Sequence, residues 1–295
     1  SIILGFAMAA VQLLPSYEFL NISIRESRPR LILEQFPYKP INLLQFIDPY
    51  ILGTPQNSSY PKWTPGKWGI FWENTAYIGI LPLALAIAEV AANFIKRSKV
   101  RPLVFIFAAL AAISILLALG GSSPLYPVFS FPPFSIFRVP SRFLLITQFS
   151  LVILSAIFLQ KLARKKIIQV IILALSILNL YWTFGSYNPQ DVAKKWLIDP
   201  PIAKWLKENK TQRIFSIGQS IIWNENFSKN GWQDINYYFF ARNSLDQNSN
   251  LIFGIDQLAA YESLLSKRTA ADLITISNGI KIQPIDLQIQ ANFAE

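Results

Sequence analysis

Two apolar stretches on either side of a basic turn decide the fold. Residues 143–160 read FLLITQFSLVILSAIFLQ, residues 167–184 read IIQVIILALSILNLYWTF, and KLARKK lies at 161–166. Each stretch is apolar around the whole circumference of a helix, which is rare for a helix on the surface of a soluble protein. A helix of about 20 residues spans the roughly 30 Å hydrocarbon core of a bilayer. The two stretches therefore predict a pair of membrane-spanning helices.

Three further apolar stretches lie upstream, at about 1–20, 76–95 and 103–119. Taken together, the stretches predict a polytopic α-helical membrane bundle with about five transmembrane helices in residues 1–185. The first stretch lacks the basic leader and the small-residue cleavage site of a signal peptide. Because the chain begins at Ser1 within this stretch, we expect it to be a C-terminal fragment of a longer protein.

Basic residues predict the orientation of the bundle. Two short turns are rich in lysine and arginine and contain no acid: Lys96, Arg97, Lys99 and Arg101 in the first, and Lys161, Arg164, Lys165 and Lys166 in the second. The positive-inside rule places both turns in the cytoplasm. The loops at about 21–75 and 120–142, and all residues after 185, are then expected on the outer face.

The amino-acid composition excludes several kinds of catalytic and binding site. The chain has no cysteine and no histidine, so thiolate chemistry, disulfides and the commonest metal ligand are absent from it. The net charge of +10 comes entirely from residues 1–184, because acidic and basic residues balance in 185–295. A nucleic-acid partner is not expected, since the soluble-looking region carries no basic excess. We expect no cofactor, although the composition leaves a divalent metal open.

The first outer loop carries arginines and tryptophans at the expected depth of the lipid headgroups. Arg25 and Arg28 lie just beyond the first apolar stretch, and Trp63, Trp68 and Trp72 follow later in the loop. The arginines could hold a specific phosphate or extend to bulk lipid phosphates. The aromatic residues could anchor the loop at the interface or cover a substrate cavity.

The second outer loop, GGSSPLYPVFSFPPFSIFRVPSR at 120–142, ends in two arginines. Arg138 and Arg142 lie on either side of Pro140, where the next helix is expected to begin. A cation at a helix N-terminus is unfavourable unless an anion lies nearby. The pattern predicts an anion site, and it leaves open whether the anion is a substrate phosphate or a membrane lipid.

Few acids lie in or near the membrane. Asp48 and Glu73 belong to the first outer loop and are the candidates for a catalytic carboxylate facing an extracytoplasmic substrate. Glu89 lies within an apolar stretch, where an ionisable residue suggests a function. Its spacing from Lys96 and Arg97 favours instead a position near the membrane surface.

Several segments together resemble the YfhO family of bacterial multi-pass membrane proteins. They are AVQLLPSYEFL, ENTAYIGILPLALA, LLALGGSSPLYPVFSFPPFSIFRVPSRFLLI and LIFGIDQLAAYESLLSKR, in this order along nearly the whole chain. The resemblance implies a GT-C-like glycosyltransferase of the bacterial cytoplasmic membrane. Such an enzyme moves a sugar from a polyprenyl-phosphate carrier to an envelope glycan or polymer. The resemblance also implies phosphate binding by Arg138 and Arg142, and a catalytic acid in a region that this fragment lacks.

After the last apolar stretch the composition becomes polar, so we predict a small extracytoplasmic α/β domain at 186–295. Its expected elements are a helix in IAKWLKENK, a strand in RIFSIG, helices in GIDQLAAYESLLSKRTAADLI and a strand in GIKIQPIDLQIQ. Two other functions stay open beside the glycosyltransferase. The chain could be a lipid or glycan transporter or flippase, or a non-catalytic anchor that presents the outer domain.

Overall fold

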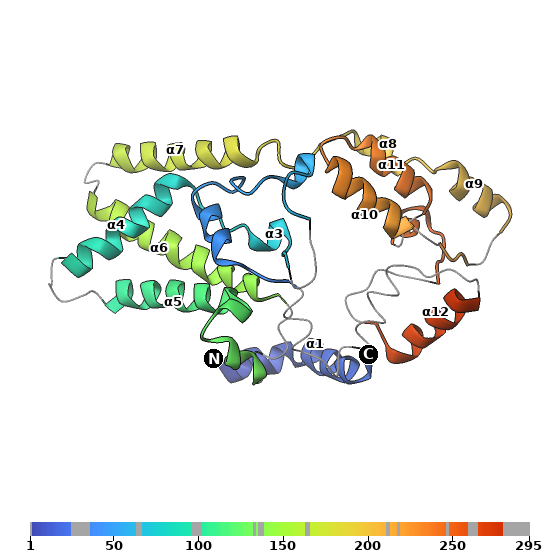
Figure 1. Ribbon diagram of the computed structural model, residues 1–295, viewed down its shortest axis with the longest axis horizontal. Helices are drawn as coiled ribbons and strands as arrows, with labels where there is room; N and C mark the ends of the chain where they lie inside the picture. Colours follow the sequence, from blue (N-terminus) through green and yellow to red (C-terminus); the bar gives the residue numbers. More distant parts are fainter. Residues whose placement is uncertain are drawn as a thin grey trace. The chain divides into compact units, whose positions relative to one another are not determined.

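The chain forms two compact units. The computed structural model describes residues 2–24, 36–62, 67–95, 102–131, 134, 139–162, 166–210, 213–216, 219–245, 248–258 and 265–279. The bundle unit comprises 30–189 together with the short segment 230–233, and the distal unit comprises 1–29, 190–229 and 234–295. Helices dominate the described part of both units (Figure 1).

Four apolar helices build the bundle unit: α4 (Ile80–Ile95), α5 (Pro102–Ala118), α6 (Leu144–Leu162) and α7 (Lys166–Phe184). Helix α6 packs against both α4 and α5, and α7 packs against α4. Ala86, Val104 and Leu154 meet in the buried core between α4, α5 and α6. A hydrogen bond of 2.7 Å between the buried hydroxyls of Ser114 and Thr147 also joins α5 to α6.

Among the described residues, two helical segments are long and apolar enough to cross a membrane, Pro140–Leu162 and Lys166–Phe184. Helices α4 and α5 have 16 and 17 residues. At 1.5 Å per residue they measure about 25 Å, which is shorter than the hydrocarbon core. Helix α1 (Ile2–Ile22) carries Pro15 and Glu18 and is not among the candidate spans. The prediction of five transmembrane helices is therefore wrong.

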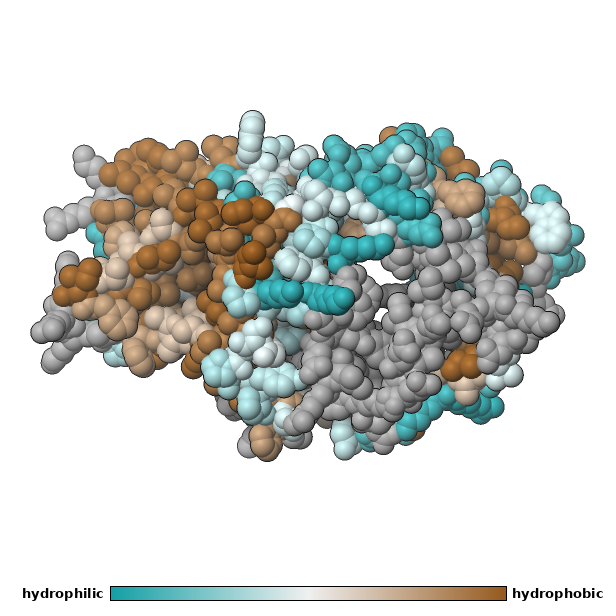
Figure 2. Space-filling view, in the orientation of Figure 1, coloured by the Kyte–Doolittle hydropathy of each residue, from teal (hydrophilic) through white to brown (hydrophobic). Residues whose placement is uncertain are grey.

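The surface of the bundle unit is strongly apolar. Leu145 on α6, and Leu173 and Leu178 on α7, each expose more than half of their surface. Figure 2 shows the resulting brown area over α4 to α7. Such continuous apolar surface is unusual for a monomeric soluble protein, and it fits a bilayer or a protein partner.

Short helical turns close one end of the bundle. They are η1 (Pro40–Phe46), η2 (Pro55–Asn57), α3 (Phe71–Asn74), η3 (Gly120–Ser122), η4 (Tyr126–Ser130) and η6 (Pro140–Phe143). Tyr38, Phe46, Phe129 and Phe143 pack into one buried cluster with the end of α5. This cluster fixes the loops that the sequence placed outside the apolar stretches.

The distal unit is also helical in its described part. It contains α1 (Ile2–Ile22), α8 (Ala193–Leu197), α9 (Pro201–Glu208), α10 (Gln219–Asn230), α11 (Asn236–Asn243), η7 (Ser249–Phe253) and α12 (Lys267–Gly279). Ala203, Leu206, Leu245 and Phe253 form one core, and Leu265, Ala270 and Leu273 form another. Asn230, the last residue of α10, is counted with the bundle unit.

No strand occurs in the described part of the distal unit, so the prediction of an α/β domain is wrong. Among the described residues of RIFSIG, at 213–216, Ile214 forms an isolated bridge to Gln257 and no named strand is present. The side chain of Ser216 donates a hydrogen bond of 2.9 Å to the carbonyl of Leu245. The second expected strand, at 279–290, lies outside the described residues except for its first glycine, which ends α12.

The helix predicted in IAKWLKENK is present as α9, with Pro201 in its first turn. Asp199, two residues before this helix, pairs with Lys207 at 2.7 Å. The helical region predicted at 254–274 is helical only from Lys267 among the described residues. The polar helices α10 and α11 had no counterpart in the sequence prediction.

Candidate functional site

Three of the predicted site residues lie among the described residues: Asp48, Glu73 and Arg142. The other three, Arg25, Arg28 and Arg138, lie outside them. The Arg138 half of the predicted anion site, and the arginine cluster after the first helix, therefore lie outside the described residues.

The structure brings Arg142 and Glu73 together in a bidentate ion pair. Arg142 Nη2 donates to Glu73 Oε1 at 2.7 Å, and Arg142 Nε donates to Glu73 Oε2 at 3.1 Å. The Arg142 side chain is 61% exposed and that of Glu73 is 20% exposed. The sequence suggested both residues but not their pairing, because 69 positions separate them.

Buried neighbours hold Arg142 at the surface. Pro140, Ser141 and Phe143 are all buried around it in η6, directly before α6. The backbone N–H of Arg142 donates to the carbonyl of Val139 at 3.1 Å. These contacts fix the backbone, so the arginine side chain starts from a defined position at the end of a candidate membrane span.

Glu73 is positioned by the short helix α3. Phe71 and Asn74 on the same helix are buried. The Thr75 hydroxyl, just after the helix, donates to the Phe71 carbonyl at 2.9 Å and accepts from Gln45 Nε2 at 3.1 Å. This polar chain ties α3 to η1 and holds Glu73 beside Arg142.

An aromatic stack lies around Phe71. Its ring is parallel to that of Tyr50 at 5.9 Å between centroids, and it stacks on Tyr187 at 5.6 Å. Tyr187 in turn meets the edge of Trp232 at 5.0 Å. Burial raises the pKa of the Tyr187 phenol and, to a lesser extent, that of Tyr50. Both phenols therefore stay neutral at physiological pH.

Trp232 reaches this stack through the turn 230–233, which the sequence prediction missed. The backbone N–H of Gln233 donates to the carbonyl of Gln56 at 3.1 Å, and Trp232 Nε1 donates to the carbonyl of Tyr187 at 2.8 Å. Gly231 has φ +65, and a Cβ there would lie 2.1 Å from the Gln56 oxygen. Glycine in a turn that ends in an aromatic residue was the available sequence signal.

Asp48 lies in an exposed turn between η1 and Tyr50. Its Oδ1 accepts a hydrogen bond of 2.9 Å from the backbone N–H of Tyr50. Because Tyr50 belongs to the aromatic stack, Asp48 is anchored two residues from it. Unlike Glu73, it has no ion pair with an arginine or lysine among the salt bridges of the described residues.

Glu89 is fully buried and pairs with Lys161, which extends from the last turn of α6. Its Oε1 also accepts a hydrogen bond of 2.8 Å from Asn93 Nδ2. The sequence favoured a position near the membrane surface for Glu89, from its spacing to Lys96 and Arg97, which lie outside the described residues. That expectation stays a prediction, and the partner of Glu89 among the described residues comes from a different helix.

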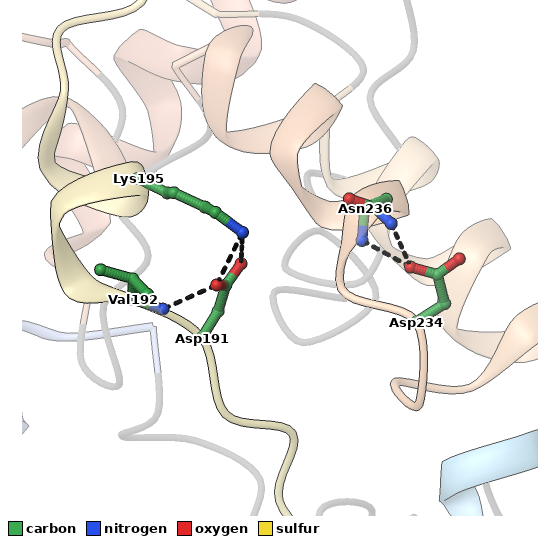
Figure 3. Close-up of polar contacts among 5 residues, drawn as sticks. All are labelled: Asp191, Val192, Lys195, Asp234 and Asn236. Carbon is green, nitrogen blue, oxygen red and sulfur yellow. Dashed lines mark hydrogen bonds and ion pairs between the residues drawn. The ribbon is translucent and has the colours of Figure 1, made fainter.

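Two carboxylates of the distal unit serve local structure (Figure 3). Asp191 accepts hydrogen bonds from the Val192 backbone at 2.6 Å and from Lys195 at 3.0 Å. The Lys195 contact, followed by the Val192 backbone, lowers the pKa of Asp191. Asp234 accepts from the Asn236 backbone at 2.9 Å and from its side chain at 2.8 Å. Both acids organise the starts of short helices.

Among the described residues, no three carboxylate side chains come close enough together to hold a metal ion. The cofactor prediction stays a prediction. Comparison of the chain with family models, curated proteins and solved structures gives no match.

Proposed function

We propose that the chain acts in the bacterial cytoplasmic membrane as a glycosyltransferase of the GT-C type. It would transfer a sugar from a polyprenyl-phosphate carrier to an envelope acceptor at the outer face. The observation that carries the proposal is the ion pair between Arg142 and Glu73, which lies at the start of a candidate span.

The position of the pair suits a lipid phosphate. Arg142 lies near the start of Pro140–Leu162, and Trp182 lies near the end of Lys166–Phe184. Consecutive spans cross a membrane in opposite directions, so these two residues would lie on the same side of the membrane. Trp182 is 89% exposed, and exposed tryptophans concentrate at the headgroup level of a bilayer. Arg142 is then at the depth of the carrier phosphate.

The geometry of the pair suits phosphate binding by Arg142 with Glu73 as a positioning residue. A guanidinium has five N–H groups, and Glu73 binds the one on Nε and one of the two on Nη2. The two on Nη1 are outside this pair and can donate to a phosphate oxygen. Glu73 fixes the plane of the guanidinium, which lowers the entropy lost when the phosphate binds.

The reaction needs one proton acceptor and one stabiliser of the leaving group. An acceptor hydroxyl oxygen attacks the anomeric carbon, and the bond from that carbon to the phosphate oxygen breaks. The phosphate leaves with the bonding electrons, and Arg142 stabilises its added charge. The hydroxyl proton passes to a carboxylate. Of the two candidate carboxylates in this chain we assign this role to Asp48, because Glu73 uses both oxygens to hold Arg142. This assignment departs from the family resemblance, which implies an acid outside this chain.

The test measures transfer of labelled sugar from polyprenyl-phosphate donors by the full chain in membranes. We expect Arg142→Gln to lower transfer by about 10²-fold or more. Arg142→Lys should restore little, because lysine cannot form the bidentate pair. An exposed ion pair contributes only about 0–1 kcal/mol to stability, so these variants should fold. Lys207→Gln, which breaks the exposed pair with Asp199, is the matched control.

The variants also separate the other functions. Asp48→Asn should abolish transfer while binding of the carrier is retained. A wild-type chain that transfers no sugar from any donor would favour the transporter or the anchor. Transfer that survives Arg142→Gln would show that the phosphate is bound elsewhere.

A further inference from the structure

We infer that the surface formed by α8 and α9 of the distal unit binds the headgroup region of an anionic lipid bilayer. The inference rests on α7 crossing the membrane and is independent of sugar transfer. Five large apolar side chains of this segment each expose between 43% and 62% of their surface: Val192, Leu197, Ile198, Ile202 and Trp205. Figure 2 shows brown, apolar atoms on the surface over α9.

Helix α9 has an apolar face beyond the one that the core uses. Ala203 and Leu206 are buried in the core of the distal unit. Ile202 and Trp205 are exposed, and they are three positions apart, so they are neighbours on the helix surface. Among the described residues, the Trp205 indole has no ring, cation or side-chain hydrogen-bond partner. The fold therefore leaves this indole available to a partner outside the unit.

Basic residues are concentrated in the same segment. Residues 191–213 contain six Lys/Arg and three Asp/Glu, a net charge of +3, whereas 214–295 carry a net charge of −3. Two lysines form ion pairs within the segment, Lys195 with Asp191 and Lys207 with Asp199. Lys194 and Lys204 are exposed and have no carboxylate partner among the salt bridges of the described residues. The charge of this surface is therefore complementary to anionic lipid phosphates.

The mixture of tryptophan, aliphatic residues and lysine favours a lipid surface over a protein partner. Helices that lie in the plane of a membrane interface combine exposed apolar residues with lysine or arginine. An indole suits the headgroup level, and a lysine stem can follow apolar surface while its ammonium reaches a phosphate. Lysine is depleted in protein–protein interfaces, so a second protein is the weaker match.

The connection to α7 makes this contact possible. Residues 185–192 separate the end of α7 at Phe184 from the start of α8 at Ala193. Such a segment extends by at most about 30 Å. If α7 crosses a bilayer, α8 therefore starts close to the bilayer surface, where the potential of anionic lipids acts.

Spin labels can measure the depth of α9, because the chain has no cysteine and a single introduced cysteine is labelled alone. The full chain carrying Ile202→Cys is placed in nanodiscs of phosphatidylcholine, with or without phosphatidylglycerol. In the anionic discs we expect the nitroxide to be more accessible to oxygen than to a water-soluble nickel chelate. Leu251→Cys is the matched control, because Leu251 is 71% exposed within the acidic region 214–295, and its label should favour the nickel chelate.

The contribution of charge is tested with Lys204→Gln. In anionic discs this change should lower the ratio of lipid-embedded to water-exposed spectral components at position 202 about fivefold, which corresponds to about 1 kcal/mol per basic residue near an anionic surface. The same change should have no effect in discs of phosphatidylcholine alone. Lys229→Gln, which removes an exposed lysine of α10, should leave the ratio unchanged. Circular dichroism checks that each variant is folded.

Several results would overturn the inference. The nickel chelate could reach position 202 as readily as position 251 in anionic discs, or both reagents could be excluded from position 202, which would indicate a protein contact. A ratio that is unchanged by Lys204→Gln would remove the anionic lipid as the partner. A label at Leu173→Cys on α7 should favour oxygen, and a preference for nickel there would remove the span on which the inference rests. Lipid contact at position 202 without sugar transfer would refute only the proposed function.

Discussion

Replacing Lys161 by methionine should destabilise the bundle unit, because it leaves the Glu89 carboxylate buried without its counter-ion. Glu89 is fully buried, while the Lys161 side chain is 32% exposed. These are the sole ionisable side chains of α4, α5 and α6. Asn93 would still donate to Glu89, but an amide cannot neutralise a charge.

The structure sets the magnitude of this effect. Removing one partner of a buried ion pair costs about 3–5 kcal/mol. Because Lys161 is one-third exposed, we expect about 3 kcal/mol, the lower end of that range. In contrast, the double variant Glu89→Leu with Lys161→Met should be close to the wild type in stability, since an apolar pair of similar volume often replaces a buried ion pair without loss.

Denaturant unfolding in detergent micelles, followed by circular dichroism, measures these differences. The reasoning requires Lys161→Met to be much less stable than the double variant. If Lys161→Met changed the free energy of unfolding by less than about 0.5 kcal/mol, as a typical surface substitution does, Glu89 would not depend on Lys161 for its burial.

Three further predictions concern other contacts. Gly231→Ala should cost more than about 1 kcal/mol, whereas Gly254→Ala, which shares φ +65 but meets nothing within 4 Å, should cost less; thermal unfolding compares them. Thr147→Val should lower the free energy of unfolding by about 0.6 kcal/mol, the mean for an interhelical hydrogen bond in a membrane bundle. Equilibrium unfolding measures this change, and a much larger loss would contradict the estimate. The pKa of Asp191 should lie below its ordinary value of 3.8; its stabilising effect is present above that value and lost as the pH falls through the folded pKa, and NMR titration should show Lys195→Ala raising the pKa.

Composition was sufficient to predict the two long apolar helices. The stretches at 143–160 and 167–184 correspond to Leu144–Leu162 and Lys166–Phe184 with small shifts at the ends. The stretch at 76–95 was predicted to be helical throughout, but α4 begins at Ile80. Gly79 has φ +97, and this backbone conformation is incompatible with a right-handed helix. Hydropathy alone contains no information about that angle.

In the distal unit, the residue pattern of short segments did not predict the secondary structure. Alternating residues around Ile214 suggested a strand, yet a strand needs a neighbour along its whole length, and Ile214 finds one at a single bridge. The polar sequences of α10 and α11 gave no helical periodicity strong enough to predict them. In these segments tertiary contacts decide the backbone conformation more than local preference does.

The candidate site could be predicted only in part. Arg142 and Glu73 each stood out as a charged residue in an outer loop, but a single sequence does not tell which acid meets which arginine. The position of Trp232 depends on contacts of its turn with Gln56 and Tyr187, which are distant in the chain. Pairings of this kind follow from the three-dimensional fold and not from residue spacing.

Whether Arg142 holds the carrier phosphate is tested by equilibrium binding of a polyprenyl-phosphate sugar to the full chain in nanodiscs, compared with the free polyprenol of the same length. We expect the phosphate-bearing lipid to bind more tightly, and we expect Arg142→Gln to remove this difference while Lys207→Gln preserves it. Equal binding of the two lipids by the wild type, or a preference that survives Arg142→Gln, would contradict the claim that Arg142 holds the carrier phosphate.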